Sequence, residues 1–442
     1  MNKEQKLLLI LAAVQFSHII DFMIVMPLGK TIMQEFSISP GQFSWVVSAY
    51  AGAALTGNLI STAFIDRFDR RSALLVLFAG FTVGTLACAF APNYPLLLLF
   101  RSLTGVFGGT LGALVLAIVG DVIPLERRAS AMGWVMTAFS AASVIGVPSG
   151  IWIASRYGWH APFLATAGIA AVFWVLASQF VPSLRGHMQE ERATSFGGGD
   201  PNVSPVQNLG EKGPNGGAIA TALEQSNLPP RHDAVGVQSW QRKTVEPFVR
   251  IFSDANQRAA LFFTAALMLG HFTIIPFIAP YFQINLEFTD NQISLVYLIG
   301  GTLTVVLLPL FGKLADRFGR MLIFTLASVF ALGSIYAITN LNTESVVIGL
   351  LASSSFFVVA SGRNVPATTM ITSVVRPENR GSFMSIRQSI NEMALFLSTV
   401  VAGFIITEDA GGKLDGYHLL GYFTMFMSVV AIAAASRIKA VA

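Results

Sequence analysis

Four ionisable side chains lie inside long apolar stretches of this chain, where charge is costly. They are Asp21, Arg101, Arg363 and Glu392. A charged side chain at the centre of a bilayer costs about 2.5–3.5 kcal/mol on insertion scales, so each one needs a partner or a functional role. A carboxylate beside an arginine can change its protonation state when the surrounding field or the access of water changes. We therefore expect Asp21 and Glu392 to take up and release protons, with Arg101 and Arg363 tuning them.

The depth of these residues predicts how they pair. At about 1.5 Å of rise per helical residue, Asp21 and Arg101 lie at similar depths in their apolar stretches, and we predict an ion pair between them. His18 lies one turn before Asp21 on the same helix face. By the same argument, Arg363 and Glu392 are a second candidate pair. Each pair is either a structural link between two helices or part of a functional site.

Neutral polar side chains accompany the charges. Gln388, Asn391 and Glu392 are spaced as i, i+3 and i+4 and form one stripe on a helix, which lipid cannot satisfy. The stripe is expected to face a cavity, with packing against another helix as the alternative. His18 and His271 can bind a substrate or carry protons near neutral pH, or they are hydrogen-bonded packing residues. The residues predicted to contact a substrate are Gln15, His18, His271, Asn364, Gln388 and Asn391.

The elements that carry these residues are predicted to be membrane-spanning helices. The chain is 53% hydrophobic and only 12% charged, which is too little charge for a soluble surface. Apolar windows of about 20 residues, long enough to cross a hydrocarbon core of ~30 Å, recur along it. They are continuous rather than alternating in polarity, which favours helices over barrel strands. The fold class is therefore an all-α membrane protein with twelve transmembrane helices, at 6–28, 42–64, 72–91, 95–119, 130–153, 161–181, 258–281, 292–312, 321–339, 345–372, 382–406 and 416–435.

The spans fall into two related halves. The run Ile-Asp-Arg-Phe-Asp-Arg-Arg at 65–71 is echoed by Ala-Asp-Arg-Phe-Gly-Arg-Met at 315–321, each after the second span of its half, and His18 recurs as His271. This order indicates two pseudo-symmetric six-helix bundles with a substrate site between them near the membrane midplane. A polar, Gly- and Pro-rich segment separates the halves and is predicted to be a mostly disordered cytoplasmic tether, with a regulatory loop as the alternative. The predicted domains are 1–182, the linker 183–257, and 258–442.

The positive charges predict the orientation in the membrane. Most of the 28 Lys and Arg residues fall in loops on the side that also carries both termini. Because cytoplasmic loops are enriched in Lys and Arg, we predict cytoplasmic termini in a multi-pass protein of the cell (inner) membrane. The basic pI near 9.2 then reflects orientation and not nucleic-acid binding.

The repeated turn carries a resemblance to a known family. Gly-Lys-Leu-Ala-Asp-Arg-Phe-Gly-Arg at 312–320 resembles the signature turn between the second and third helices of major facilitator superfamily transporters. The first copy is similar, but Thr62 and Asp69 stand where the family pattern has glycines. The resemblance implies that Asp66 and Asp316 are charged partners that hold the outward-open state, with a plain solvated turn as the alternative. The gating residues expected from this turn and its contacts are Asp66, Arg67, Arg70, Asp121, Gly312, Asp316, Arg317, Gly319 and Arg320.

Four further segments resemble the drug:proton antiporter branch of that superfamily. Residues 21–28 are similar to its first-helix pattern, 101–105 to its fourth-helix arginine motif, and 146–150 to a variant of its fifth-helix antiporter motif. Residues 158–163 resemble its Gly-Trp-Arg-x-x-Phe segment, with His160 in place of the arginine. Close helix contact or bending, which serves either packing or gating, is expected at Gly146, Pro148 and Gly150.

Together these features predict a secondary active transporter that works by alternating access and uses protons to export a small drug-like or amphipathic metabolite. The alternatives are a sugar or nucleoside exporter of the same superfamily and, from another class, a transport-inactive membrane receptor or scaffold. The sequence has no His-Glu-x-x-His, no zinc-spaced His/Cys cluster and no phosphate-binding Gly-rich loop, so no enzyme, metal or other cofactor is expected. The expected partners are the small-molecule substrate, protons and the lipid bilayer, without nucleic acid, and a monomer is expected.

Overall fold

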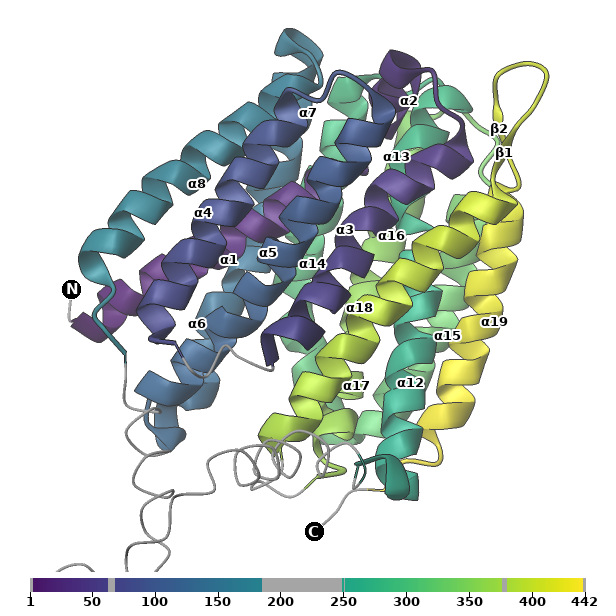
Figure 1. Cartoon of the computed structure of the whole chain (residues 1–442). Coiled ribbons are helices and arrows are strands. Elements are labelled where there is room, and N and C mark those ends of the chain that lie inside the picture. The colour runs from purple at the N-terminus through teal and green to yellow at the C-terminus, as the bar shows by residue number, and fades with distance from the viewer. Residues whose placement is uncertain (1–2, 63–67, 185–248, 250, 376–379, 440–442) are drawn as a thin grey trace, which may run out of the picture.

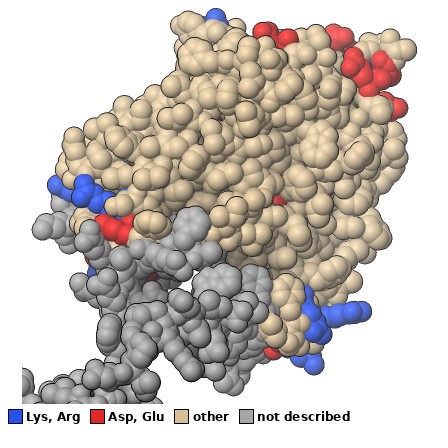
Figure 2. Space-filling view, viewed as in Figure 1, with Lys and Arg blue, Asp and Glu red and all other residues tan. Residues whose placement is uncertain are grey.

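The computed structural model describes residues 3–62, 68–184, 249, 251–375 and 380–439. Apart from one short β-hairpin, the elements of the described chain are helical (Figure 1). Twelve helical segments are long and apolar enough to cross a membrane. Charged side chains gather at the two ends of the molecule and leave a broad, almost uncharged belt on the face shown in Figure 2. The predicted all-α membrane fold with twelve spans is confirmed.

The first bundle contains the first six spans. Its helices are α1 (Lys3–Ile24), α2 (Gly29–Phe36), α3 (Pro40–Thr62), α4 (Arg70–Ala89), α5 (Tyr94–Val122), α6 (Leu125–Ala141), the π-helical turn η2 (Ala142–Gly146), α7 (Val147–Tyr157) and α8 (His160–Phe180).

The second bundle contains the other six spans. Its helices are α12 (Ala255–Phe272), α13 (Ile275–Ile284), α14 (Asp290–Phe318), α15 (Arg320–Thr339), α16 (Val346–Gly362), α17 (Asn364–Thr372), α18 (Arg380–Ile405) and α19 (Tyr417–Ala435). Before α19, strand β1 (Thr407–Glu408) pairs antiparallel with β2 (Leu414–Asp415). We call the end of the molecule that carries this hairpin the hairpin side, and the opposite end, where the C-terminus lies, the terminal side (Figure 1).

Two spans that the sequence predicts as continuous are interrupted, the seventh between α12 and α13 and the tenth between α16 and α17. The first span ends earlier than predicted, at Ile24, and a break at 25–28 separates α1 from α2. A proline lies in or just after each break, namely Pro27, Pro276 and Pro366. Proline has no N–H to give to the carbonyl four residues earlier, so the helical ladder is interrupted there.

Among the described elements, the most extensive contacts between the two bundles are three. Helix α3 packs on α18, α14 packs on α7 and η2, and α2 packs on α13. Small residues permit the close approach, because a Cβ atom added to Gly403 would lie 2.5 Å from Ser44 Cβ, and one added to Gly41 would lie 2.9 Å from the Gly403 carbonyl oxygen. Such backbone contact is typical of membrane helices.

The hydrophobic core differs between the two sides of the molecule. Toward the hairpin side, one buried cluster includes residues of both bundles, among them Phe43 and Phe277. Toward the terminal side, the described residues form one cluster around Leu74 and Ile118 in the first bundle and a separate one around Ala260 and Phe383 in the second. Among the described residues, the bundles therefore share a buried core toward the hairpin side and have separate cores toward the terminal side.

Most of the predicted linker lies outside the described residues. Its described end includes Ile251, which is buried, and Asp254, whose carboxylate accepts hydrogen bonds from the Asn256 and Gln257 backbone N–H groups and caps α12. The predicted domain boundaries and the tether role stay predictions.

Candidate functional site

The predicted ion pair between Asp21 and Arg101 is present. The Arg101 Nη1 atom lies 2.7 Å from Asp21 Oδ2, and both side chains have 0% exposure. Thr85 on α4 donates a hydrogen bond of 3.1 Å to the other carboxylate oxygen, Asp21 Oδ1. The Arg101 guanidinium also lies 4.9 Å from the centre of the Tyr50 ring on α3. Four helices thus converge on one buried carboxylate, which lies one turn before the break that ends α1.

Glycine lets these helices come together. A Cβ atom added to Gly105 would collide with the Tyr50 backbone, and one added to Gly84 would lie 2.8 Å from Thr104 Oγ1. The arginine of the 101–105 motif therefore reaches Asp21 because α5 has glycine at its contact with α3.

Two other predicted substrate contacts on α1 face α5. A Cβ atom added to Gly112 would lie 3.0 Å from His18 Nε2 and 3.9 Å from Gln15 Nε2. His18 Nε2 and Gln15 Oε1 have no hydrogen-bond partner among the described residues. His18 lies near Asp21 in sequence, but its Nε2 faces α5 and not the carboxylate.

The predicted pair between Arg363 and Glu392 is not formed, and this prediction is wrong for this state. Arg363 lies at the break between α16 and α17 and donates a 2.9 Å hydrogen bond from Nη1 to Ser428 Oγ on α19. Glu392 Oε1 accepts a 2.7 Å hydrogen bond from Gln388 Nε2, one turn earlier on α18. Equal depth does not fix the direction in which a side chain leaves its helix, and these two side chains leave in different directions.

Glu392 instead lies near the first bundle. Tyr50 is within electrostatic reach of Asp21, Arg101 and Glu392. One turn further along α18, the Phe396 ring lies 2.9 Å from the position of a Cβ atom added to Gly52 on α3. The two predicted proton-carrying carboxylates therefore both lie within electrostatic reach of Tyr50.

A cavity of about 210 Å³ lies between the bundles toward the terminal side. The first bundle contributes Asn58, Ser61 and Thr110, and α18 contributes Ser385, Gln388 and Ser389. The predicted substrate contact Gln388 thus lines a cavity and is exposed. Asn391 is half-buried, and its Oδ1 atom has no partner among the described residues.

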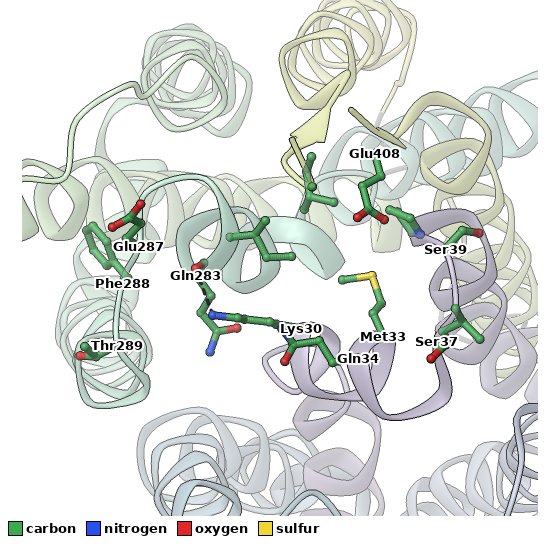
Figure 3. A pocket seen from close by; sticks show the side chains of 15 residues that line it. Lys30, Met33, Gln34, Ser37, Ser39, Gln283, Glu287, Phe288, Thr289 and Glu408 are labelled. Atoms are coloured by element: carbon green, nitrogen blue, oxygen red, sulfur yellow. Dashed lines mark hydrogen bonds between the residues drawn. The ribbon is translucent and has the colours of Figure 1, made fainter. Parts of the chain in front are cut away.

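The hairpin side carries a second hollow, of about 760 Å³, above the contact between α2 and α13 (Figure 3). Lys30 on α2 points to α13 and donates a 3.4 Å hydrogen bond from Nζ to the Gln283 carbonyl oxygen. At the same contact, the rings of Phe43 and Phe277 meet edge to face, 5.9 Å between centres. The hollow is lined by none of the predicted site residues, and the packing beneath it closes the hairpin side.

The described gating residues of the repeated turn lie at the terminal side. Arg70 Nε donates a 2.9 Å hydrogen bond to Asp121 Oδ2, which brings two of the expected gating residues together. Asp66 and Arg67 lie outside the described residues. In the second copy, Gly319 has a φ of 96°, a conformation that suits glycine and lets α15 begin directly after α14. The exposed members of the second copy are Asp316, Arg317, Gly319 and Arg320, and Gly312 lies half-buried on α14.

The fifth span packs closely against α1 through the predicted motif. A Cβ atom added to Gly146 would lie 2.5 Å from the Ile20 side chain, and one added to Gly150 would collide with Ile24. The π-helical turn that ends at Gly146 puts Pro148 in the first turn of α7, where its missing N–H is tolerated. These residues are packing contacts next to the break in α1, and their gating role stays a prediction.

Several contributors to the site were not predicted from the sequence. Tyr50, Thr85 and Ser428 each complete the surroundings of a buried charge, but single hydroxyl groups are common in apolar helices and give no signal of their own. Within the described part of the chain, no three His, Cys, Asp or Glu side chains are close enough to hold a metal ion.

Comparison with known proteins gives the family. A sequence model of the Major Facilitator Superfamily matches residues 11–362 and 260–439. The chain therefore belongs to the major facilitator superfamily, whose members are membrane transporters.

Individual relatives are more distant. The inner membrane transport protein YdhP of Escherichia coli is 33% identical over 151 residues, which cover 34% of this chain and 39% of YdhP. The multidrug efflux pump LfrA of Mycolicibacterium smegmatis is 26% identical over 405 residues, which cover 87% of this chain and 77% of LfrA. A bacterial homologue of the human lysosomal transporter Spinster, solved in an inward-facing, occupied conformation, has the same fold with a TM-score of 0.70. It is 14% identical, and the match covers 98% of this chain and 96% of that one.

Proposed function

We propose that this chain is a secondary active exporter of small drug-like or amphipathic molecules that is driven by protons. The observation that carries the proposal is the fully buried Asp21–Arg101 pair next to the break that follows α1. Membership of a transporter superfamily and the similarity to the efflux pump LfrA support export of this kind of molecule.

The proposed cycle uses protonation to loosen the first bundle. When the hairpin side is open, water brings a proton to the Asp21 carboxylate, which becomes neutral and loses most of its attraction to Arg101. The contact between α1 and α5 then weakens, and the bundles rock toward the state described here, with the hairpin side closed. Release of the proton toward the terminal side restores the ion pair. Glu392, which also lies within electrostatic reach of Tyr50, is the second proposed proton carrier.

The remaining predicted residues take roles around this step. Arg101 tunes Asp21, Arg363 keeps a positive charge at the centre of the second bundle, Gln388 and Asn391 meet the substrate toward the terminal side, and the turns at Arg70 and Asp316 contribute to the gate. We further propose cytoplasmic termini, a monomer, and a place in the inner membrane like that named for YdhP.

A transport assay tests the proposal. Purified protein in liposomes is given a pH gradient of either direction and a panel of amphipathic dyes, drugs and aromatic acids, and substrate and proton fluxes are recorded. We expect substrate flux to follow the gradient in the parent and to lose that dependence in Asp21→Asn and in Glu392→Gln. Glu344→Gln, which removes an exposed loop carboxylate, is the matched control and should transport like the parent. Flux that ignores both the gradient and the two substitutions would remove the proton mechanism.

The same experiment separates the alternatives. A sugar or nucleoside exporter would move hydroxylated solutes in preference to the amphipathic panel. A receptor or scaffold would move none of these compounds under any gradient.

A further inference from the structure

A buried positive charge without a carboxylate partner lies in the second bundle. The Arg363 side chain is fully buried and forms no ion pair with any residue that the structure describes. Its Nη1 atom donates to the neutral Ser428 hydroxyl, while Nε and Nη2 have no partner among the described residues. A lone cation at this depth is costly unless something negative accompanies it.

The surroundings add positive character and unmet hydrogen-bonding groups. Arg363 immediately precedes α17, whose first backbone N–H groups form the positive end of that helix. His271 on α12 lies within electrostatic reach of Arg363, and its Nδ1 atom has no partner among the described residues. The same holds for Asn364 Oδ1 and for Thr424 Oγ1, one turn before Ser428. Buried polar atoms without partners indicate a ligand, ion or water at the place they surround.

The apolar part of this cluster is aromatic. The rings of His271 and Phe356 stack with centres 6.2 Å apart and an interplanar angle of 22°. Phe272 meets His271 edge to face at 5.0 Å, and Phe357 lies beside Phe356 at 5.7 Å. His271 and Asn364 are half-buried, whereas Arg363 is fully buried. One guanidinium with two free N–H positions next to flat rings matches a single carboxylate on a flat apolar body.

We propose that Arg363, which Ser428 holds in place near His271, binds the anionic group of the transported molecule, and that this molecule is an aromatic organic acid with one negative charge. The inference rests on the proposed export function and names its substrate class. The Arg363 guanidinium holds the carboxylate through Nε and Nη2, and the surrounding rings contact the apolar body. Arg101 does not share this role, because Asp21 already neutralises it.

Binding of matched acids and amides tests the inference. The full chain, purified in detergent and chloride-free buffer without any pH gradient, is titrated with benzoate, phenylacetate and indole-3-acetate and with the three corresponding carboxamides. Affinity is measured by calorimetry. We expect at least one acid to bind about tenfold or more tightly than its amide, as charge-assisted hydrogen bonds to a buried cation imply. The ratio should fall to about one in Arg363→Gln and stay well above one in Arg363→Lys, which keeps the charge. Arg437→Gln removes an exposed arginine and should behave like the parent.

Each outcome supports or overturns the inference. The inference is overturned if the parent binds acids and amides with equal affinity, a measurement that needs no variant. It is also overturned if a folded Arg363→Gln protein keeps the parent's ratio of acid to amide affinity. Chloride that binds at the same site and displaces the acids with equal affinity also overturns it, because the site then holds an inorganic ion. Acid binding through Arg363 together with flux that ignores the pH gradient would support the anion site and reject the proton-driven mechanism. Gradient-driven flux of uncharged compounds, without flux of the acids, would support the proton-driven mechanism and reject the anion site.

Discussion

The buried arginine has a different kind of partner in each of the two bundles. In the first bundle, Arg101 lies 2.7 Å from Asp21, and this carboxylate also accepts a hydrogen bond from Thr85. In the second bundle, Arg363 is equally buried but donates to a hydroxyl, on Ser428, and meets no carboxylate among the described residues. The first bundle therefore neutralises its own charge, while the second leaves a positive charge unbalanced.

This difference separates two roles that the sequence assigns to similar residues. A self-neutralised pair can respond to a proton, because protonation of its acid changes the contact between two helices. An unbalanced cation responds to an anion instead. The two related halves have thus diverged in the charge at their centre. The substitutions below test this difference, and the measured quantity is the free energy of unfolding in mixed micelles.

The largest effect is expected from Asp21→Asn. The substitution leaves the Arg101 charge buried without compensation, and breaking a buried pair in this way costs about 3–5 kcal/mol. In the double variant Asp21→Asn/Arg101→Met no charge is left, so most of the lost stability should return. An Asp21→Asn protein as stable as the parent would mean that Arg101 has another counter-charge and that the first bundle does not differ from the second in this respect.

Removing the hydroxyl partners gives the next largest effect. Ser428→Ala takes away the hydrogen bond that Arg363 makes to a described residue and should destabilise the protein by about 1.5–3 kcal/mol, the range for bonds to charged groups. Thr85→Val removes a bond to the Asp21 carboxylate and should cost less, near the lower end of the same range of about 1.5–3 kcal/mol, because this carboxylate is still paired with Arg101. Equal losses in the two variants would contradict the view that Arg363 is the less compensated charge.

Replacing Arg363 itself should have an effect of the opposite sign. Arg363→Met removes a charge whose burial is costly, so stability is expected to stay level or to rise by up to about 2 kcal/mol. The same protein should lose its preference for acids over amides. A loss of stability comparable to that of Asp21→Asn would show that Arg363 is neutralised in the folded protein and would remove the contrast between the bundles.

The sequence predicted the fold and the first pair because both depend on rules that act along the chain. Apolar length fixes a span, and equal depth on neighbouring helices was enough to place Asp21 next to Arg101. The second pair was missed because depth says nothing about rotation around the helix axis. The break at Arg363 and the direction of its side chain toward α19 depend on how α12, α17 and α19 pack. The type of a single residue does not predict this packing.

The smallest effect is expected at the terminal side, where Arg127 on α6 pairs with Glu4 on α1. The atoms Arg127 Nη2 and Glu4 Oε2 lie 3.0 Å apart, close to the 2.7 Å of the buried pair, but the Arg127 side chain is 61% exposed. Water screens such a pair, so Arg127→Gln should lower the free energy of unfolding by only about 0.2–1 kcal/mol. In 1 M salt, where the screening length is about 3 Å, that difference should vanish, whereas the loss in Asp21→Asn should persist. A large, salt-resistant loss in Arg127→Gln would mean that bond length governs the strength of these pairs. A small one would mean that burial does, which is the property that sets Asp21 and Arg101 apart from an ordinary surface contact.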